Sequence, residues 1–183
     1  MGGDGDAFGV LFGRHARAVY NFGFRATADW AAAEDIASEV FLTAWRRRSE
    51  VIFTTESGSV LPWLLGVAVN HMRNQRRGRR RGDAAIARLS RRDDQPDFTD
   101  ELLGRIADEA QMAEVRAVVE QLAEHERDVL ALCAWAGLDY EEAAIALDLP
   151  VGTIRSRLSR ARAHVRELVA ANGHDRSRDL VTR

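Results

Sequence analysis

The sequence predicts an all-α protein made of two small helical domains joined by a flexible linker. Apolar residues recur at intervals of three and four along most of the chain, which is the period of an amphipathic helix, and no stretch shows the sustained alternation of a strand. The prolines stand where a helix would begin or a linker would run: Pro62, Pro96 and Pro150. At 183 residues, with 46% apolar side chains, the chain suits one or two soluble globular domains.

The first domain is predicted over residues 6–81 and contains three helices. Apolar positions in 8–20 and 29–45 have helical spacing, so these two helices are expected to pack as a hairpin. After a polar loop at 53–59, a third helix is expected to begin near Pro62 and to continue into a run of arginines.

The second domain is predicted over residues 111–171. Residues 82–110 mix charged and polar side chains with few large apolar ones, which predicts an acidic linker between the domains, with room for a short helix near Leu102 and Leu103. The helical period then resumes and predicts four short helices, followed by a polar tail over 172–183. Each domain has fewer than a hundred residues, so we expect each to build only a modest core.

Charge is segregated along the chain, although the formal net charge is only -2. All 26 basic residues are arginine; residues 71–92 carry nine of them against one acid, whereas residues 93–126 carry eleven acids against two arginines. Such blocks are typical of tails, solvated faces or nucleic-acid contacts, so charge alone does not choose among them.

No segment of the sequence predicts secretion or a membrane span. The N-terminus lacks a basic start followed by an apolar run, and the longest apolar stretch, 60–69, is too short to cross a bilayer. The single cysteine, Cys133, excludes an internal disulfide framework and any zinc site built on cysteine pairs. We therefore expect a cytoplasmic protein in which Cys133 packs as a small core residue.

The C-terminal half of the second domain has the pattern of a helix-turn-helix. Asp139 can cap a helix whose third residue, Glu142, reaches back to the Asp139 amide in an acidic version of the capping box. That helix ends near Asp148, which tolerates the left-handed conformation of a tight turn, and Pro150 suits the start of the next helix. An apolar stripe on that next helix is expected to face the core: Val151, Ile154, Leu158, Ala161, Val165 and Leu168.

The opposite face of this last helix carries arginine, serine and threonine, which suits the reading of guanine edges and phosphates in the major groove of duplex DNA. The predicted contacts are Thr153, Arg155, Ser156, Arg157, Ser159 and Arg160. The competing interpretation is a solvated amphipathic helix, which is the commoner role of a single charged helix. The capped helix and tight turn that precede it favour DNA binding.

The third helix of the first domain predicts a surface for single-stranded DNA. The predicted contacts share one side of the helical wheel: Trp63, Asn70, Arg73, Asn74 and Arg77. An unpaired base can stack on the tryptophan while the asparagines bond its edge and the arginines hold the backbone. The alternative is that Trp63 belongs to the core, because tryptophan is buried on average. The arginines that follow favour the DNA surface.

Three acids on the second helix, Glu34, Asp35 and Glu39, form a patch without a basic residue nearby. Such carboxylates can hold a metal ion, dock a basic partner or face solvent, and the solvated face is the default. A metal-dependent nuclease is therefore the enzyme-class alternative. No histidine stands near these acids, and no histidine or cysteine spacing forms a ligand set, so we predict no catalytic residue, metal or cofactor.

In their order along the chain, these surfaces resemble those of the extracytoplasmic-function (ECF) sigma factors of bacterial RNA polymerase. The resemblance covers about residues 8–168. Residues 33–45, AEDIASEVFLTAW, are similar to the polymerase-binding helix of conserved region two, and 62–70, from PWL to AVN, to its promoter-melting helix. Residues 138–144, LDYEEAA, and 150–162, PVGTIRSRLSRAR, are similar to region four over a long and specific match.

The resemblance implies a promoter-specificity subunit without catalytic activity. Region two would dock on the clamp helices of the largest polymerase subunit, and region four would sit on the flap of the second-largest subunit. The implied polymerase contacts are Asp35, Ser38, Glu39 and Trp45. The Trp63 surface would read the minus-ten element as melted single strand, with the 53–59 loop receiving an extruded base. Region four would read the minus-thirty-five element as duplex.

The resemblance also implies a position and a partner beyond the promoter. The acidic linker would lie in the RNA exit path, where its charge could imitate RNA. The family often pairs with an anti-sigma factor, for which the exposed faces of both domains are the natural target.

Two positions depart from the family pattern. Ser38 stands where many members have glutamine, which is expected to remove one polymerase hydrogen bond. Leu65-Gly66 occupies the last two places of a Trp-Leu-Tyr-Arg stretch, so one arginine contact to the DNA backbone is expected to be absent. A stand-alone helix-turn-helix regulator is the second alternative, but it would leave the Trp63 surface and the acidic patch without a role.

Overall fold

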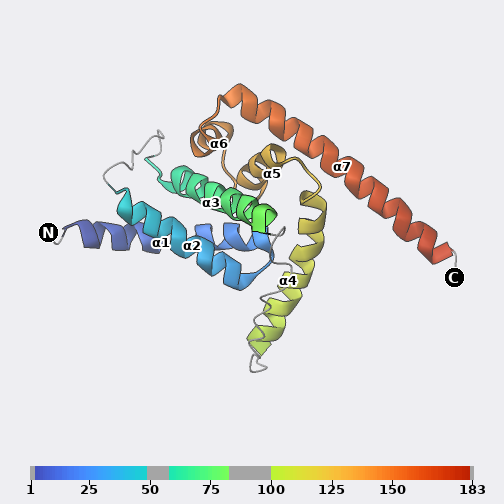
Figure 1. Ribbon diagram of the computed structural model, residues 1–183, viewed down its shortest axis with the longest axis horizontal. Helices are drawn as coiled ribbons and strands as arrows, with labels where there is room; N and C mark the ends of the chain where they lie inside the picture. Colours follow the sequence, from blue (N-terminus) through green and yellow to red (C-terminus); the bar gives the residue numbers. More distant parts are fainter. Residues whose placement is uncertain (1–2, 49–57, 83–99, 182–183) are drawn as a thin grey trace.

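The computed structural model describes residues 3–48, 58–82 and 100–181, with side chains described over 5–48, 58–78 and 108–171. Every element in these ranges is helical, which confirms the all-α class (Figure 1). Most of the predicted loop at 53–59 and of the predicted linker lies outside the described residues. The elements are α1 (Gly3–Thr27), α2 (Trp30–Arg46), α3 (Leu61–Gly82), α4 (Asp100–Val119), α5 (Glu124–Leu130), a π-helical turn (Ala131–Trp135), α6 (Tyr140–Leu147) and α7 (Val151–Val181).

The N-terminal module, α1–α3, is built around the predicted hairpin of α1 and α2. Asp29 caps α2, because its Oδ1 accepts a hydrogen bond from the Ala32 amide at 3.0 Å. Gly23 lets the two helices approach closely, since a Cβ added there would lie 3.2 Å from the Cα of Ala33. Helix α3 packs against this hairpin, and large side chains from all three helices are buried between them: Val19, Phe22, Ile36, Val40 and Leu64.

The C-terminal module, α4–α7, contains the predicted helix-turn-helix in α6 and α7. The Asp139 carboxylate accepts from the Glu142 amide at 2.7 Å, and the Asp139 amide donates to Glu142 Oε2 at 3.1 Å, which confirms the capping box. Asp148 ends α6 in the left-handed conformation, with φ 52°. The turn therefore has the local chemistry that the sequence indicates, and it directs α7 away from α6.

Two helices are longer than the sequence predicts. Helix α4 begins at Asp100, so the short helix expected near Leu102 and Leu103 is continuous with the first helix of the second module. Helix α7 continues to Val181 through most of the segment expected to be a polar tail. The start of α4 is rich in alanine, glutamate and leucine, which favour helix even without a continuous apolar face. Among the side chains described on α7, the fully buried ones lie in its first half: Ile154, Leu158 and Ala161.

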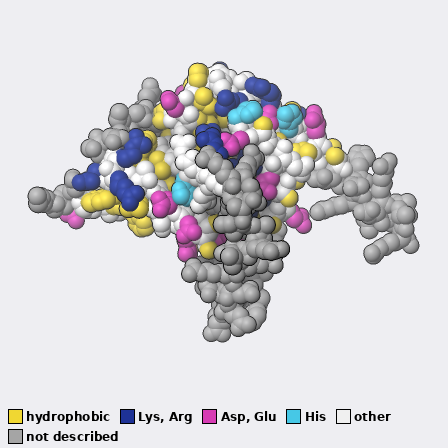
Figure 2. Space-filling model, in the orientation of Figure 1, with side chains coloured by type: hydrophobic (Ala, Val, Ile, Leu, Met, Phe, Trp, Pro, Cys, Tyr) yellow, Lys and Arg dark blue, Asp and Glu magenta, His cyan; other side chains and the backbone are white. Residues whose placement is uncertain are grey.

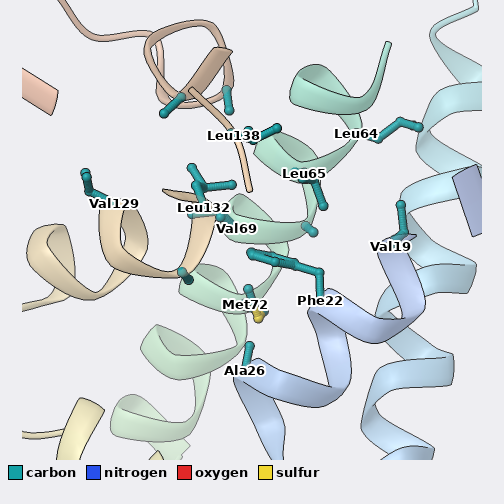
Figure 3. Close-up of a cluster of buried hydrophobic side chains, with 14 of the residues drawn as sticks. Val19, Phe22, Ala26, Leu64, Leu65, Val69, Met72, Val129, Leu132 and Leu138 are labelled. Atoms are coloured by element: carbon teal, nitrogen blue, oxygen red, sulfur yellow. The ribbon is translucent and has the colours of Figure 1, made fainter. Parts of the chain in front are cut away.

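The two modules share one continuous apolar cluster instead of building separate cores. Figure 3 shows Leu65 and Val69 of α3 in the same buried cluster as Leu132 and Leu138 of the C-terminal module, with Phe22 of α1 alongside. All five side chains are buried. The sequence predicts two modest cores because helical periodicity shows which face of a helix is apolar, not which helix will cover it.

The seam between the modules is closest where α3 meets α6. A Cβ added to Gly66 would lie 2.3 Å from the carbonyl oxygen of Ala146, so only glycine fits this approach. At the neighbouring contact, Arg25 of α1 donates to the carbonyl of Trp135 at 2.6 Å. The docking therefore combines apolar packing, a backbone close approach and a polar link.

Candidate functional site

The first candidate surface is the polar face of α7, defined by the six predicted duplex-DNA contacts. Arg155, Ser156, Ser159 and Arg160 are exposed, and Thr153 and Arg157 are half-buried. The hydroxyl of Ser156 donates to the carbonyl of Thr153 at 3.0 Å, and Arg160 Nε donates to the carbonyl of Ser156 at 3.3 Å. Within the described part of the chain, the three arginines of this face form no ion pair. Their charge is thus available to phosphate groups.

Tyr140, the first residue of α6, extends this surface beyond α7. The Arg155 guanidinium lies 5.4 Å from the centroid of the Tyr140 ring, a cation–π distance. These two side chains line a polar groove of about 310 Å³ together with Ser159, Arg162 and Arg166. Three guanidiniums along one groove suit the phosphate backbone of a duplex. Arg162 flanks the predicted face in the sequence pattern, whereas Tyr140 and Arg166 are identified as neighbours of this face only by the structure.

The second candidate surface is the α3 face, defined by the five predicted single-strand contacts. Asn70 and Asn74 are exposed, and Trp63 is half-buried with the Arg47 guanidinium 5.8 Å from its ring centroid. Trp63 is therefore neither a fully buried core residue nor a free aromatic platform. The opposite side of the helix is buried as the wheel predicts: Leu64, Leu65, Ala68 and Met72.

Arg73 and Arg77 of this face point toward the C-terminal module. Arg73 Nε donates to Asp128 Oδ2 at 2.7 Å, and its Nη2 lies at the same distance from that oxygen. Arg77 Nη2 lies 3.6 Å from Glu124 Oε1, and Arg73 Nε lies 3.8 Å from it. The structure thus separates the five predicted contacts into an open group around the asparagines and a pair of arginines engaged by α5.

The third candidate surface is the outer side of α1 and α2. The acidic residues Glu34, Asp35 and Glu39 are exposed, as is Ser38. Beside them, a shallow groove of about 510 Å³ is lined by residues of both helices, chiefly Phe12, Ala16, Tyr20, Ala37, Ser38 and Phe41. Carboxylates next to an apolar groove suit a protein partner with basic and apolar side chains.

Several large apolar side chains of α1 and α2 are exposed to solvent. Trp45 is 37% exposed, its ring meets the Phe8 ring edge-on with centroids 5.1 Å apart, and the Arg48 guanidinium lies 4.6 Å from its centroid. Val10 and Phe12 are 62% and 49% exposed. Figure 2 shows hydrophobic side chains exposed near the N-terminal end of α1. Exposed apolar side chains such as Phe12, which also lines the groove, are typical of an interaction site.

Other chemistry was sought in the described ranges. They contain no group of three or more His, Cys, Asp or Glu side chains placed to hold a metal ion. None of the helices in these ranges is long and apolar enough to cross a membrane. Cys133 is half-buried against the apolar cluster, and burial raises the pKa of its thiol, which makes it a poor nucleophile.

Comparison with known proteins matches both modules to one family. Residues 11–82 match Sigma-70 region 2, and residues 112–165 match Sigma-70, region 4. The RNA polymerase sigma-H factor of Pseudomonas aeruginosa is 32% identical over 171 residues, which cover 87% of this chain and 84% of the relative. The ECF RNA polymerase sigma factor EcfG of Rhodopseudomonas palustris is 32% identical over 146 residues, which cover 77% and 73% of the two chains. The chain belongs to the ECF sigma factors.

Solved structures of sigma factors share the fold of this ECF sigma factor. RpoE of Bartonella quintana, solved with the anti-sigma factor NepR, has a TM-score of 0.64 and 21% identity, over 90% of this chain and 97% of that one. CnrH, solved with the cytosolic domain of CnrY, has a TM-score of 0.64 and 24% identity, over 91% and 89%. The predicted combination of region 2 and region 4 in an all-α protein is confirmed.

As an ECF sigma factor, the protein directs the initiation of transcription by RNA polymerase and belongs to a class of regulatory initiation factors, not of classical enzymes. Family membership favours the promoter-specificity subunit over the stand-alone regulator and the nuclease. Which residues contact polymerase and promoter stays a prediction at this point.

Asp128 of the sigma factor carries a buried charge at the seam. Its side chain is 4% exposed, and burial raises the pKa of its carboxyl above the ordinary value. Arg73 and Arg76 oppose the shift, while Glu124 adds to it. The ion pair with Arg73 therefore offsets only part of the cost of burying the carboxylate.

This raised pKa predicts a pH dependence of stability. An acid whose pKa is raised in the folded chain binds its proton more tightly there than in the unfolded chain. The free energy of unfolding therefore rises as the pH falls through the raised pKa of the folded chain. The rise is complete once the pH is below the unfolded-chain pKa of about 3.9. We expect the free energy of unfolding of the native chain, relative to Asp128→Asn, to rise as the pH is lowered from 7 toward 4. Urea unfolding of both proteins across this range measures the difference, and a constant difference would contradict the assignment.

Sequence reasoning does not find the seam. Asp128 and Glu124 lie on a short helix whose pattern indicates only an amphipathic segment, and their partners on α3 are about fifty residues away in sequence. Gly66 is visible in the sequence as a departure from the family pattern. The reason that glycine fits here is the carbonyl group of Ala146, which would collide with any Cβ at position 66. This reason appears only in the three-dimensional structure.

Proposed function

We propose that this ECF sigma factor binds core RNA polymerase through α1 and α2, reads the minus-ten element as melted single strand along α3, and reads the minus-thirty-five element as duplex along α7. The observation that carries the proposal is the polar face of α7. It follows a capped helix and a left-handed turn at Asp148, and its arginines form no ion pair in the described ranges.

The α7 face supplies duplex recognition. Arginine and serine at the start of a helix can reach guanine edges and phosphates when that helix lies in the major groove. Five arginines on the face and its groove are placed for phosphates: Arg155, Arg157, Arg160, Arg162 and Arg166. If all five bind, the slope of the logarithm of the duplex affinity against the logarithm of the salt concentration is about -4.5.

The α3 face supplies recognition of the melted strand. Asn70 and Asn74 are exposed one turn apart on the helix, and the half-buried Trp63 lies on the same side, where a base would stack on its ring in place of the Arg47 guanidinium. Opening five base-pair steps costs roughly 7 kcal/mol at about 1.4 kcal/mol per step. A helix with one aromatic platform cannot supply this alone, so polymerase must contribute, and it also raises the joint affinity of two weak DNA readers by holding both.

The α1–α2 groove supplies the polymerase contact. Asp35 and Glu39 would pair with basic side chains of the largest subunit, while Trp45 and Phe12 offer apolar area beside them. RpoE and CnrH were each solved with a partner protein, and we propose an anti-sigma factor for this chain as well, bound over the exposed faces of the two modules. A sigma factor works with its polymerase, so we place it in the cytoplasm.

Asp35→Ala tests the polymerase contact. Loss of a charge-assisted hydrogen bond is worth about 1.5–3 kcal/mol, so the affinity for core polymerase should fall roughly tenfold to hundredfold. DNA preference should stay the same, because α3 and α7 are untouched. Fluorescence titration with core polymerase measures the affinity. Glu141→Ala, which removes another exposed acid on α6, is the control, and equal affinities for Asp35→Ala and this control would remove the patch from the proposal.

Run-off transcription tests the proposal as a whole. Sigma-free core polymerase is incubated with fragmented DNA from the source genome, with and without the protein, and the transcript starts are sequenced. New starts that share two upstream elements at a fixed spacing are the expected result. Selective retention of duplex fragments by the protein alone, without new starts, would overturn it.

A further inference from the structure

A groove of about 380 Å³ lies where α1, α3, α4 and α5 meet, and no part of the proposed function uses it. Three arginines from three different helices line this arginine groove: Arg76 of α3, Arg116 of α4 and Arg127 of α5. In Figure 1 it lies where the C-terminal end of α3 is next to α5 and to the end of α4. We propose that the arginine groove binds the phosphate group of a small phosphorylated molecule, with Arg76 and Arg127 as the residues that hold it.

The open pair, Arg76 and Arg127, has hydrogen-bond donors without acceptors in the described part of the chain. Nε of Arg127 is buried and has no partner there, although its Nη2 donates to the Leu122 carbonyl at 3.3 Å. Arg76 is half-buried and forms no hydrogen bond or ion pair with any residue that the structure describes. A buried donor without an acceptor costs free energy. The oxygens of an anion in the groove would supply the acceptors that both side chains lack.

The carboxylates around the groove already accept hydrogen bonds from groups other than the open pair. Glu120 accepts from Arg116 Nε at 2.7 Å, and Asp29 accepts from a backbone amide at the start of α2. Asp128, next to the groove, accepts from Arg73 at 2.7 Å. The arginines of the open pair are therefore the cations of this groove that are left for a ligand.

Burial and like charge both act against the ionised form of Arg76. Burial lowers the pKa of its guanidinium, and the charge of Arg127 lowers it further. Asp128 and Glu120 act in the opposite direction, while Arg116 adds to the lowering. The net shift is downward, so the nearby carboxylates compensate only in part for burial and for the repulsion among the arginines. A bound anion would offset both effects.

The shape and chemistry of the arginine groove suit a phosphate ligand. A guanidinium presents a planar fork of N–H groups that matches the oxygens of a phosphate. Pockets for small ligands usually measure about 300–1,000 Å³, so the groove has room for a phosphate group with a small organic part. Beside the arginines it is lined by the apolar side chains of Ala26, Ala32 and Met72, which suit that organic part.

Thermal unfolding of the full chain, with and without inorganic phosphate, tests the proposal. Sodium chloride at the same ionic strength is the reference, because salt also screens charges in general. Phosphate at about five times its Kd should raise the melting temperature about 2–4 °C above that reference. Arg76→Gln and Arg127→Gln should each lose this rise, whereas Arg14→Gln, which changes an exposed arginine of α1, should keep it. A rise of the same size in all four proteins, or none in the native chain, would overturn the proposal.

Isothermal titration calorimetry with pyrophosphate measures the size of the effect. Loss of one charge-assisted hydrogen bond should weaken binding roughly tenfold to hundredfold in Arg76→Gln or Arg127→Gln. Arg127→Lys keeps the charge but not the planar fork, so it should recover only part of the loss. If Arg127→Gln loses its helical circular dichroism signal, Arg76→Gln and Arg127→Lys decide the matter. Equal affinities of these two variants and the native chain would overturn the proposal.

A comparison of ligands separates the sources of the phosphate. Inorganic phosphate, pyrophosphate and ATP are titrated in turn. Tighter binding of ATP than of pyrophosphate would assign the site to nucleotides, and equal affinities would assign it to the phosphate groups alone. Oligothymidylate is the fourth ligand, because α3 also carries the proposed strand-binding face. Loss of oligothymidylate affinity in Arg76→Gln, without binding of any of the three small phosphates to the native chain, would overturn the proposal and assign Arg76 to the melted strand.

Discussion

Replacement of Leu132 by alanine should lower the free energy of unfolding by about 2–5 kcal/mol. The side chain is fully buried, in the apolar cluster that both modules share. Removing it leaves a cavity that α3 and the π-helical turn cannot both close, because each is fixed by its own helical hydrogen bonds. Equilibrium unfolding in urea, followed by circular dichroism, measures the loss.

The control for this change is Val169→Ala, on the part of α7 that extends past the core. Val169 is 55% exposed, so its truncation should change stability by no more than about 0.5 kcal/mol. Because a domain of this size has only about 5–15 kcal/mol of stability, the Leu132 variant should also melt at a clearly lower temperature. Equal unfolding midpoints for the two variants would show that the shared cluster does not stabilise the chain.

Trp63→Ala should reduce the yield of open promoter complexes by about tenfold to hundredfold, while binding of the minus-thirty-five duplex stays unchanged. The stacking of one base on an aromatic side chain is worth about 1–3 kcal/mol, and each 1.4 kcal/mol is about a factor of ten. Permanganate reactivity of unpaired thymines measures the open complex. The α7 face lies on another module, so its duplex affinity serves as an internal measure of correct folding.

Trp63→Phe is the conservative variant that separates stacking from packing. It retains an aromatic face and should recover most of the open-complex yield. If alanine and phenylalanine variants open promoters as well as the native chain does, Trp63 plays no part in strand recognition. In that case Asn70 and Asn74, which are the exposed members of the α3 face, become the residues to replace next.

The helix-turn-helix could be predicted in detail because its signals are local. Asp139 and Glu142 are three residues apart, and the hydrogen bonds between them form within one turn of helix. Asp148 takes the left-handed conformation that its side chain tolerates better than most. The apolar stripe of α7 follows from a single helical period. For this element, sequence neighbours are also structural neighbours.

The seam could not be predicted, because its partners come together only after two modules fold. A wheel of α3 places Arg73 correctly on the polar side, but nothing in that wheel distinguishes an arginine that faces water from one that faces Asp128. Likewise, the sequence does not distinguish Asp128 from the other acidic residues of its short helix, and only the structure shows that it is buried. Assigning DNA contacts from one helix therefore names residues of the right chemistry without showing which are already engaged.

Helix α7 has one further consequence for how the molecule moves. It runs without interruption for 31 residues, about 45 Å at 1.5 Å per residue, and its far half extends beyond the rest of the protein (Figure 1). A continuous helix of this length behaves as a stiff rod, so a rotation of about 10° at Val151 would carry Val181 through about 8 Å. If the start of α7 is fixed on the promoter, a small change in the tilt of the helix would displace its C-terminal end by a large distance.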